Sequence, residues 1–510
     1  MRYWRFNLAD IFIKFTGIIN RRLPSDEGEA SDPILRENWL ARDGVLKKPQ
    51  GNESVVTDLG SIPRWIQRYS SIESSVVSPK TFVYTENGKI RVLDDNAGTS
   101  SEVKDQLNTN AYPKSQLFKT GEQNKMFIVD GEGLYSHDGN NDNTFIKVDL
   151  VDSDGNSVEP IDVIEHKDRL IVISKTSIFI SKNLEPEVFD DATDSIQIIV
   201  GSGRGSNLAL GKIEDKLYIF NSEGIYGLDG DVISALASTF EVRLVDERKI
   251  IAGRTAVTVE KAIVFLADDF ELWSWNGSTS ELLTYELKLK DFVNTYRDKV
   301  DKATAIYENN YYKMSFVQKG DSEPNVEVWW DAFENKCDIV KGRHVACSMK
   351  TDPNTENQYV QLGMSNKNTI TQDYREALFN GDTIATRLRT RDITPKSGQN
   401  GRFLAFYPKF SPTGNRDIII RYLLDGRLSN PTDTAHFTHN LRGETTTLGF
   451  IEITNQGQFT GRYRPKIKCS RGESVAFEII EATASLKADF LGMGIDFLAK
   501  FKSKGSKVGA

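Results

Sequence analysis

The chain has 510 residues, which is too long for one ordinary hydrophobic core, so we expect two or three domains. Apolar residues make up 39% of the chain and charged residues 27%, proportions that are ordinary for a folded, soluble protein. The formal net charge of −8 disfavours tight, general binding to nucleic acid, because phosphate contacts need a basic surface.

No apolar run approaches the roughly 18 residues that a membrane-spanning helix needs, so no membrane span is expected. Asp10 and Lys14 interrupt the apolar residues near the N-terminus, and we therefore expect no signal peptide. Cys337, Cys347 and Cys469 form an odd and sparse set. Such a set argues against a disulfide framework and indicates a reducing compartment.

Residues 1–55 are interpreted as an N-terminal arm. The stretch SDEGEASDP at 25–33 is rich in charges and in residues that end regular structure. The following ILRENWLARDGVLKKPQG, at 34–51, predicts a short helix or turn and then an extended segment.

The most informative feature of the chain is a hairpin that recurs six times. Each copy has an apolar strand, a small turn with Gly, Asp, Asn or Ser, and a second strand that holds an aromatic residue. The starts lie 44, 44, 47, 46 and 49 residues apart. The six copies begin at Phe82, Met126, Leu170, Leu217, Ile263 and Tyr312.

A repeat of about 45 residues is the length of a four-stranded propeller blade. A hairpin cannot bury its apolar face alone, so the repeated units have to stack. The fold class is therefore predicted to be mainly β, with a β-propeller of about six blades over residues 56–374. A series of β-sandwiches or a solenoid with chance spacing is the alternative.

Residues 375–485 form a second β-rich region, predicted to be a β-sandwich-like platform domain. Residues 486–510 end in FKSKGSKVGA and are predicted to be a basic, flexible tail. The five strand candidates of the platform are FLAFYPKFSP, RDIIIRYLLDGR, TLGFIEIT, GRYRPKIKCS and SVAFEIIEAT.

Three motifs resemble chemical sites, but each has a simpler structural interpretation. The group Cys337, His344 and Cys347 lacks zinc-site spacing and a fourth ligand. The loop DSDGNS from Asp152 has its glycine at the wrong position for an EF-hand, and GSGRGS from Gly201 is followed by strands rather than by a helix. We expect no catalytic residue, no metal and no cofactor, and we predict that the chain is not an enzyme.

Two basic stripes are the candidate interaction sites. Residues at alternate positions of a strand lie on one face, so each stripe would form a positive ribbon. Such a ribbon would meet an acidic neighbouring subunit, an adaptor or DNA; the simpler reading is a solvated sheet face paired with acidic neighbours. The stripes are Arg387, Arg389 and Arg391, and Arg462, Arg464, Lys466 and Lys468.

Several segments together resemble the tail nozzle family of short-tailed bacteriophages, also called tail hub or packaged-DNA stabilisation proteins. The resemblance lies in the propeller-like stretches at 196–231 and 261–296 and in the strand–turn–strand FYPKFSPTGNRDIIIRYLLDGRLSNP. It extends to the opening at 17–51, with its step from acidic residues to Asn38 and its turn at Arg42. It lies in pattern and not in an invariant motif.

This resemblance implies a structural, non-enzymatic subunit of a virion tail that is assembled in the host cytoplasm. It implies a homo-oligomeric ring, usually of six copies, below the head-to-tail adaptor protein and around the DNA exit channel. Tail fibres or spikes would attach outside, and genomic DNA would pass through the lumen without sequence-specific binding. The alternatives are a carbohydrate-binding or glycan-cleaving β-propeller of a tail spike, and a WD40-type scaffold, which the missing GH and WD signatures disfavour.

Overall fold

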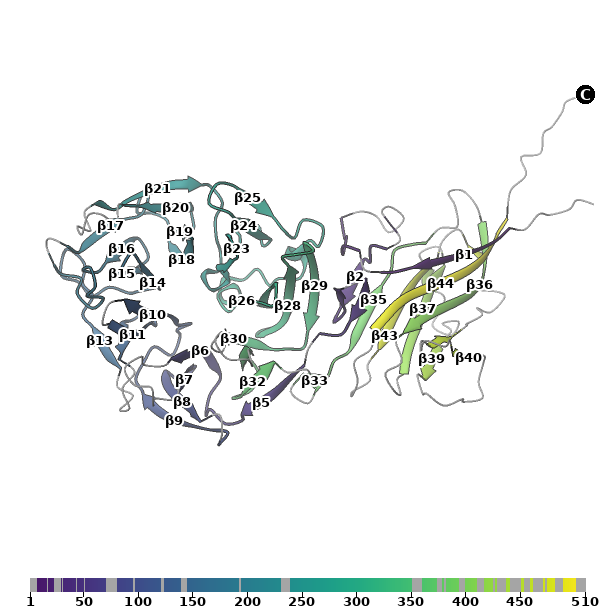
Figure 1. The fold of residues 1–510 in the computed structure, drawn as a ribbon, viewed down its shortest axis with the longest axis horizontal. Coiled ribbons are helices and arrows are strands. Elements are labelled where there is room, and N and C mark those ends of the chain that lie inside the picture. The colour runs from purple at the N-terminus through teal and green to yellow at the C-terminus, as the bar shows by residue number, and fades with distance from the viewer. Residues whose placement is uncertain are drawn as a thin grey trace, which may run out of the picture. The chain divides into compact units, whose positions relative to one another are not determined.

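The computed structural model is mainly β, with almost no helix (Figure 1). The helical elements among the described residues are η2 (Gly253–Thr255), η3 (Leu289–Asp291) and α1 (Arg297–Val300). The structure describes residues 7–15, 17–22, 29, 31–42, 44–49, 51–69, 80–94, 97–120, 123–138, 145–191, 194–230, 239–350, 360–373, 378–379, 382–393, 400–410, 417–424, 427–428, 437–440, 451–453, 459–461, 471–472, 475–481 and 489–500.

The chain forms two compact units. Unit 1 comprises 1–51, 336–341 and 375–510, and unit 2 comprises 52–335 and 342–374. Unit 2 therefore lies between parts of unit 1 in the sequence and is interrupted by residues 336–341 of unit 1, which contains both ends of the chain. The predicted boundaries divided the chain into consecutive segments and did not foresee this arrangement.

Unit 2 begins with five four-stranded antiparallel sheets, each built from strands that are consecutive in the chain. Sheet 1 contains β6 (Pro63–Tyr69), β7 (Lys80–Thr85), β8 (Lys89–Asp94) and β9 (Thr99–Lys104); sheet 2 contains β10 (Lys114–Thr120), β11 (Gln123–Val129), β12 (Leu134–His137) and β13 (Ile146–Val148); sheet 3 contains β14 (Asp162–His166), β15 (Arg169–Ile173), β16 (Ser177–Ile180) and β17 (Ile196–Ile199); sheet 4 contains β18 (Asn207–Ile213), β19 (Lys216–Asn221), β20 (Gly224–Asp229) and β21 (Glu241–Asp246); sheet 5 contains β22 (Val257–Val259), β23 (Ala262–Leu266), β24 (Leu272–Trp275) and β25 (Ser280–Leu282).

Two further sets of strands complete unit 2. Sheet 6 contains β26 (Thr304–Glu308), β27 (Tyr311–Val317) and β28 (Pro324–Asp331), and sheet 7 contains β30 (Val345–Lys350), β31 (Val360–Met364), β32 (Ile370–Asp373) and β5 (Asn52–Val56). The strand β5 comes from the beginning of the unit; it pairs antiparallel with β32 and places Asn52 opposite Asp373.

The first strands of the seven sheets contact one another in a closed cycle. In chain order, β6 contacts β10, then β14, β18, β22, β26 and β30 follow, and β30 returns to contact β6. Figure 1 shows β6, β10, β14, β18, β26 and β30 on the inner side of unit 2, with β9, β13, β17 and β21 on its outer side. The sheets of unit 2 therefore surround a common centre.

The six predicted hairpins are confirmed as the second and third strands of sheets 1 to 6. These strands are apolar on both faces because neighbouring sheets cover both faces; Leu170, Ile171, Val172 and Ile173 are all fully buried. The repeat missed sheet 7, whose hairpin β31–β32 is short and whose fourth strand comes from far away in the sequence.

Apolar clusters join adjacent sheets. The cluster between sheets 2 and 3 contains Phe127 and Leu170, and that between sheets 3 and 4 contains Ile171 and Ile219. Comparable clusters join sheets 1 and 2, sheets 4 and 5, and sheets 7 and 1. Burial between neighbours, rather than within one sheet, is the main hydrophobic contribution to unit 2.

Unit 1 contains two sets of paired strands, with orders β29-β2-β35-β43-β37-β38 and β3-β4-β44-β36-β41-β40. In addition, β39 pairs with β37, β1 with β44, β42 with β36, and β33 with β34. The strands are β1 (Asn7–Ile13), β2 (Leu35–Glu37), β3 (Leu40–Arg42), β4 (Val45–Lys47), β29 (Lys336–Lys341), β33 (Leu378–Phe379), β34 (Asp382–Thr383), β35 (Thr386–Arg389), β36 (Asn400–Phe410), β37 (Asp417–Leu424), β38 (Arg427–Leu428), β39 (Phe437–Asn440), β40 (Ile451–Ile453), β41 (Phe459–Gly461), β42 (Arg471–Gly472), β43 (Val475–Glu481) and β44 (Asp489–Lys500).

One sequence expectation is met only in part in unit 1, and another fails. The segment at 34–51, expected to be a short helix or turn followed by an extended segment, forms the strands β2, β3 and β4; in β2, Arg36 is fully buried and donates from Nε to Asp338 Oδ1 at 2.6 Å. The segment expected to be a flexible tail contains the 12-residue strand β44, which pairs with β36 and β1. Its buried Phe490, Met493 and Ile495 account for the order of this strand.

Candidate functional site

The centre of unit 2 holds a cavity of about 330 Å³ that is lined by the first strands of its sheets. Trp65 and Gln67 reach it from β6, Lys114 from β10 and Asp162 from β14. Arg254 reaches it from η2, directly before β22. Every sheet of unit 2 contributes residues to this one central space, which makes it the candidate ligand site of the unit.

An ion pair ties three sheets and η2 together at this centre. The Lys114 ammonium lies 2.5 Å from Asp162 Oδ2, and it also donates to the carbonyls of Leu208 and Gly253 at 3.3 and 3.1 Å. The same Asp162 oxygen accepts the Leu210 backbone N–H at 2.8 Å. Lys114 begins sheet 2 and Asp162 begins sheet 3, while Leu208 and Gly253 belong to sheet 4 and η2, so the pair acts as a hub.

Arg254, in η2, links this side of the centre to β6 and β30. Its guanidinium donates to the carbonyl of Ala346 in β30 at 2.7 Å and to that of Arg64 in β6 at 3.2 Å. The guanidinium also lies over the Tyr112 ring, 5.1 Å from its centroid, and Arg64 lies over the same ring at 4.8 Å. Burial of the guanidinium lowers the pKa of Arg254, although the residue as a whole is partly exposed.

The other polar side chains of the lining bond to their own surroundings. Trp65 Nε1 donates to Ser115 Oγ at 3.0 Å, and Ser115 Oγ lies 3.3 Å from Gln67 Oε1. The Gln67 and Gln116 amides donate to the carbonyls of the residues that follow them, at 2.9 and 2.7 Å. These groups are therefore satisfied without a ligand.

Cys347 also lines the cavity, and its environment is unfavourable for nucleophilic chemistry. Burial raises the pKa of its thiol to about 12, despite the nearby Arg254 guanidinium. A thiol with this pKa stays protonated at neutral pH, whereas the thiolate is the reactive form. The arrangement at the centre can therefore hold sheets together, but it presents no activated nucleophile at this position.

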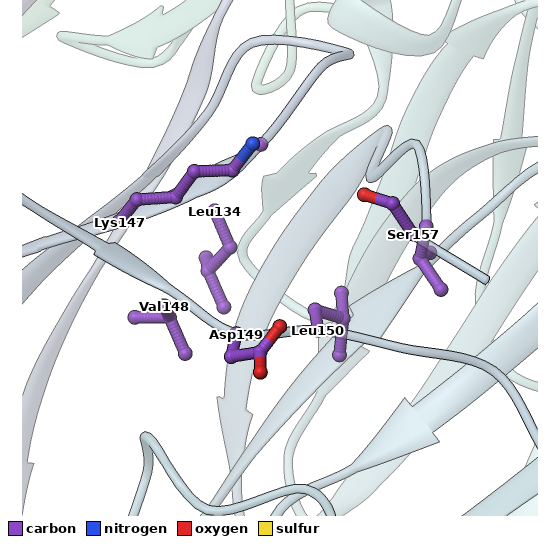
Figure 2. A pocket seen from close by; sticks show the side chains of 8 residues that line it. Leu134, Lys147, Val148, Asp149, Leu150 and Ser157 are labelled. Carbon is purple, nitrogen blue, oxygen red and sulfur yellow. The ribbon is translucent and has the colours of Figure 1, made fainter. Parts of the chain in front are cut away.

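A second hollow of about 320 Å³ lies on the surface beside β12 and β13 (Figure 2). Its floor is apolar, with Leu134 and Val148 belonging to the cluster between sheets 2 and 3. Figure 2 shows Lys147, Asp149 and Ser157 around it, and all three side chains are exposed. Side chains that are this exposed are not held in one conformation by packing. This hollow therefore lacks the preorganised polar groups that a specific binding site needs.

The structure separates the first predicted basic stripe. Arg387 and Arg389 are exposed at alternate positions of β35, with Leu388 fully buried between them, as the alternation predicts. Arg391 lies beyond the end of β35, is itself buried, and donates to the Asn20 carbonyl. Arg387 pairs with Glu478 at 2.5 Å, so part of this stripe follows the simpler reading of a paired sheet face.

The second stripe, Arg462, Arg464, Lys466 and Lys468, lies outside the described residues. Of the remaining motifs, Cys337 belongs to unit 1, whereas His344 and Cys347 belong to unit 2. Among the described residues, no group of three or more His, Cys, Asp or Glu side chains could hold a metal ion.

The two loops that resembled ligand sites are turns. The Asp152 carboxylate accepts the backbone N–H groups of Asp154 and Asn156 at 2.9 and 2.8 Å, and these bonds lower its pKa. Gly201 and Gly203 have φ of +56° and +71° in the connection between β17 and β18. A Cβ at Gly201 would come within 2.3 Å of the Tyr226 hydroxyl, so glycine is required there for packing.

Sequence reasoning missed the central hub of Lys114, Asp162 and Arg254. One signal was available: Lys114 and Asp162 are each the first residue of the first strand of a sheet. An alignment of the repeats on these first strands, rather than on the hairpins, would have placed both charges at the centre. Arg254 lies in η2 and had no such signal.

Comparisons with known proteins assign no family. No family model and no curated protein matches the chain. The computationally designed Ika8 protein is 10% identical, with a TM-score of 0.36 over 63% of this chain and 99% of that one. BBS1N, crystallised in complex with ARL6DN, is 10% identical, with a TM-score of 0.40 over 67% of this chain and 98% of that one. At these TM-scores neither likeness assigns a fold or a function. No helix among the described residues is long and apolar enough to cross a membrane.

Proposed function

We propose that the chain is a non-enzymatic structural subunit of a bacteriophage tail, with unit 2 as a rigid β-propeller and unit 1 as its platform. The observation that carries the mechanical part is the closed cycle of contacts between the first strands, from β6 around to β30 and back to β6. Seven sheets take part, so the proposal is a seven-bladed propeller rather than one of about six blades. Closure of such a cycle leaves only short sheet edges exposed and makes the body rigid.

The hydrogen bonds among the groups that line the centre favour a scaffold over a ligand-binding propeller. A glycan-binding propeller would present a central pocket lined by Trp, Arg and Glu. The cavity contains Trp65 and Arg254, but Trp65 donates to Ser115 and Arg254 Nη2 donates to two backbone carbonyls, and the described lining includes no Glu. Loss of those bonds would offset the gain from a sugar, because buried polar groups are costly to leave unpaired.

The tail assignment rests on the sequence resemblance. The chain passes between the two units at 51–52, 335–336, 341–342 and 374–375. A closed ring of identical subunits needs head-to-tail contacts with a rotation that closes. Unit 1 is the proposed source of these contacts and of those with the head-to-tail adaptor; fibres or spikes would attach outside.

The proposal places the DNA channel between subunits and not along the axis of one propeller. A cavity of about 330 Å³, crossed by the bonds of Lys114 and Arg254, has no room for duplex DNA. The net charge of −8 suits a lumen that DNA passes without adhering. A ring that encloses DNA therefore has to be made from several copies.

Native mass spectrometry of the full chain, alone and mixed with the cognate adaptor, tests this proposal. We expect one closed stoichiometry, six copies in the family that the sequence resembles. A glycan array run on the same sample supplies the competing readout. A chain that stays monomeric in both conditions and retains a glycan would contradict the structural role and favour the tail-spike alternative.

A further inference from the structure

Arg254 carries a positive charge at the centre of unit 2 that no carboxylate of the described residues balances. Its Nη2 donates to the carbonyls of Ala346 and Arg64, which are neutral acceptors, and its guanidinium lies over the Tyr112 ring. Its Nη1 is buried and has no hydrogen-bond partner in the described part of the chain. Polar groups inside proteins are usually hydrogen-bonded and charges are usually paired, so the surroundings of this guanidinium are incomplete.

Another buried arginine of unit 2 shows what complete surroundings contain. Arg343 is 1% exposed, lies 3.1 Å from Glu327 and forms a second ion pair with Asp373. Burial acts to lower the pKa of Arg343, but the carboxylates of Asp373 and Glu327 outweigh it and the pKa is raised. Burial also lowers the pKa of Arg254, and no carboxylate of the described residues opposes it there. The missing partner of Arg254 is therefore a negatively charged acceptor.

The described lining of the central cavity has one positive charge in excess. Lys114 and Asp162 lie 2.5 Å apart in this lining and neutralise each other. Arg254, which borders the same cavity and is partly exposed, is the remaining charged residue of the described lining. An unbalanced charge in these surroundings is unfavourable, because they screen it less than bulk water does. One negative charge inside the cavity would balance it.

The size of the cavity and its apolar lining indicate which kind of anion it would take. Its volume of about 330 Å³ lies at the lower end of the range for ligand pockets, about 300–1,000 Å³, so the ligand is small. Ile164, Leu210 and Val257 contribute apolar groups to the lining, which favours an anion with a short hydrocarbon part over a fully hydrated inorganic ion. A doubly charged anion such as sulfate would leave one negative charge in excess. A monocarboxylate meets both conditions.

We propose that the central cavity of unit 2 binds one small monocarboxylate, whose negative charge balances the Arg254 guanidinium. Hydrogen bonds between a guanidinium and a carboxylate are about twice as strong as those between neutral groups. Such a ligand leaves the bonds of Lys114, Asp162 and Trp65 in place, because Arg254 has donor capacity that the described residues do not use. A glycan, in contrast, offers hydroxyl groups and no charge to balance this cation.

A carboxylate in this cavity would stabilise the residue that already joins β6 and β30. Arg254 donates to the Ala346 carbonyl in β30 at 2.7 Å and to the Arg64 carbonyl in β6 at 3.2 Å. A ligand that binds the folded chain and not the unfolded one shifts the equilibrium toward the folded state. The site therefore adds a ligand to the structural role proposed above, and it does not depend on the tail assignment.

Titration of the full chain with propionate and with propionamide, followed by NMR of the ligand at constant ionic strength and neutral pH, tests the site. The two compounds have nearly the same size and shape, and only propionate is charged. We expect propionate to bind about tenfold more tightly than propionamide, because it alone forms a charge-assisted bond. Sulfate at the same ionic strength should not displace propionate. Equal affinities for the two compounds, no binding of propionate, or its displacement by sulfate would overturn the proposal.

Three variants locate the binding. Arg254→Met should weaken propionate binding about tenfold, to the level of propionamide, because it removes the unbalanced charge. Arg243→Met is the matched control, since the Arg243 side chain is 67% exposed and pairs with Glu241, and it should leave both affinities unchanged. If Arg254→Met does not fold, Ala305→Asp places a fixed carboxylate in the same lining and should weaken propionate binding by a similar factor. Undiminished propionate binding in either folded cavity variant would overturn the proposal.

Discussion

At the scale of single residues, the centre of unit 2 encloses two oppositely charged side chains. Lys114 and Asp162 are largely buried, with side-chain exposures of 17% and 8%. Each makes further bonds to backbone groups of neighbouring sheets. Removing one partner leaves the other charge enclosed and uncompensated, which costs more than the pair itself contributes.

Lys114→Met should therefore lower the free energy of unfolding of unit 2 by about 3 kcal/mol, the order found when buried pairs are broken. Lys89→Met is the matched control, because Lys89 and Glu102 form a pair at 2.7 Å with both side chains more than a third exposed. That exposed pair should contribute less than about 1 kcal/mol. Urea unfolding of both variants measures the difference; equal losses would contradict the role of the hub.

His166 in β14 provides a prediction about pH. It is 1% exposed, and burial, with smaller contributions from Lys212 and Lys167, lowers its pKa from 6.5 to about 4. The unfolded chain binds this proton near pH 6.5 and the native chain only near pH 4. The stability contribution is therefore present above pH 6.5 and is lost as the pH falls through that window.

Between pH 7 and pH 4.5 this group should lower the free energy of unfolding by about 2–3 kcal/mol, at 1.36 kcal/mol per pKa unit. His166→Gln should reduce the loss over the same interval by that amount, whatever its stability at pH 7. Chemical unfolding at the two pH values measures this. An unchanged pH dependence in the variant would show that His166 does not titrate in this range.

Substitutions of Arg391 and Arg389 in the first stripe should change stability by different amounts. Arg391 is buried and donates to the Asn20 carbonyl, so Arg391→Met should destabilise unit 1 by several kcal/mol. Arg389 is exposed, so Arg389→Glu should change stability by less than about 0.5 kcal/mol. Thermal unfolding separates the two. If the stripe is an interface, Arg389→Glu should also weaken assembly, and unaltered assembly would remove Arg389 from that interface.

At the scale of elements, β5 is the strand on which closure depends. It supplies the fourth strand of sheet 7, where Asn52 Nδ2 donates to Thr371 Oγ1 at 2.9 Å. Its Val56 is fully buried in the cluster that joins sheets 7 and 1. A strand from the beginning of unit 2 thereby completes its final sheet.

Val56→Asp should destabilise both sheets 7 and 1 by several kcal/mol, because it buries a carboxylate without a partner. Glu53→Ala, at an exposed position of the same strand, is the control and should have little effect. Hydrogen exchange in β6, β7 and β32 reports the effect. Loss of protection confined to β5 would mean that closure does not stabilise its neighbours.

The strands also show which pairings could be predicted from the sequence and which could not. The hairpins of sheets 1 to 6 were predictable because alternation, turn residues and a spacing near 45 residues agree. The pairing of β5 with β32 and of β1 with β44 was not, because partners about 300 residues or more apart leave no local signal. Arg36 is expected to be exposed in any local pattern, and its burial depends on Asp338 and on the carbonyls of Phe15 and Gly17, which are distant in the sequence.

At the scale of the whole molecule, the chain forms two compact units, and unit 1 contains both chain ends. The proposed propeller supplies rigidity through a closed cycle of contacts between its sheets and through the hydrogen-bonded side chains at its centre. Neither feature needs a cofactor or a catalytic group. Both suit a part whose work is mechanical, which is the central claim for this protein.

Electron microscopy of the purified protein, and of the particle from which it comes, tests that claim most directly. We predict a ring of identical subunits, about six, seated on the tail axis, with an opening wide enough for duplex DNA between the subunits and no opening through a single one. A compact monomer that is absent from every particle, or DNA that passes along the axis of one unit 2, would contradict the account.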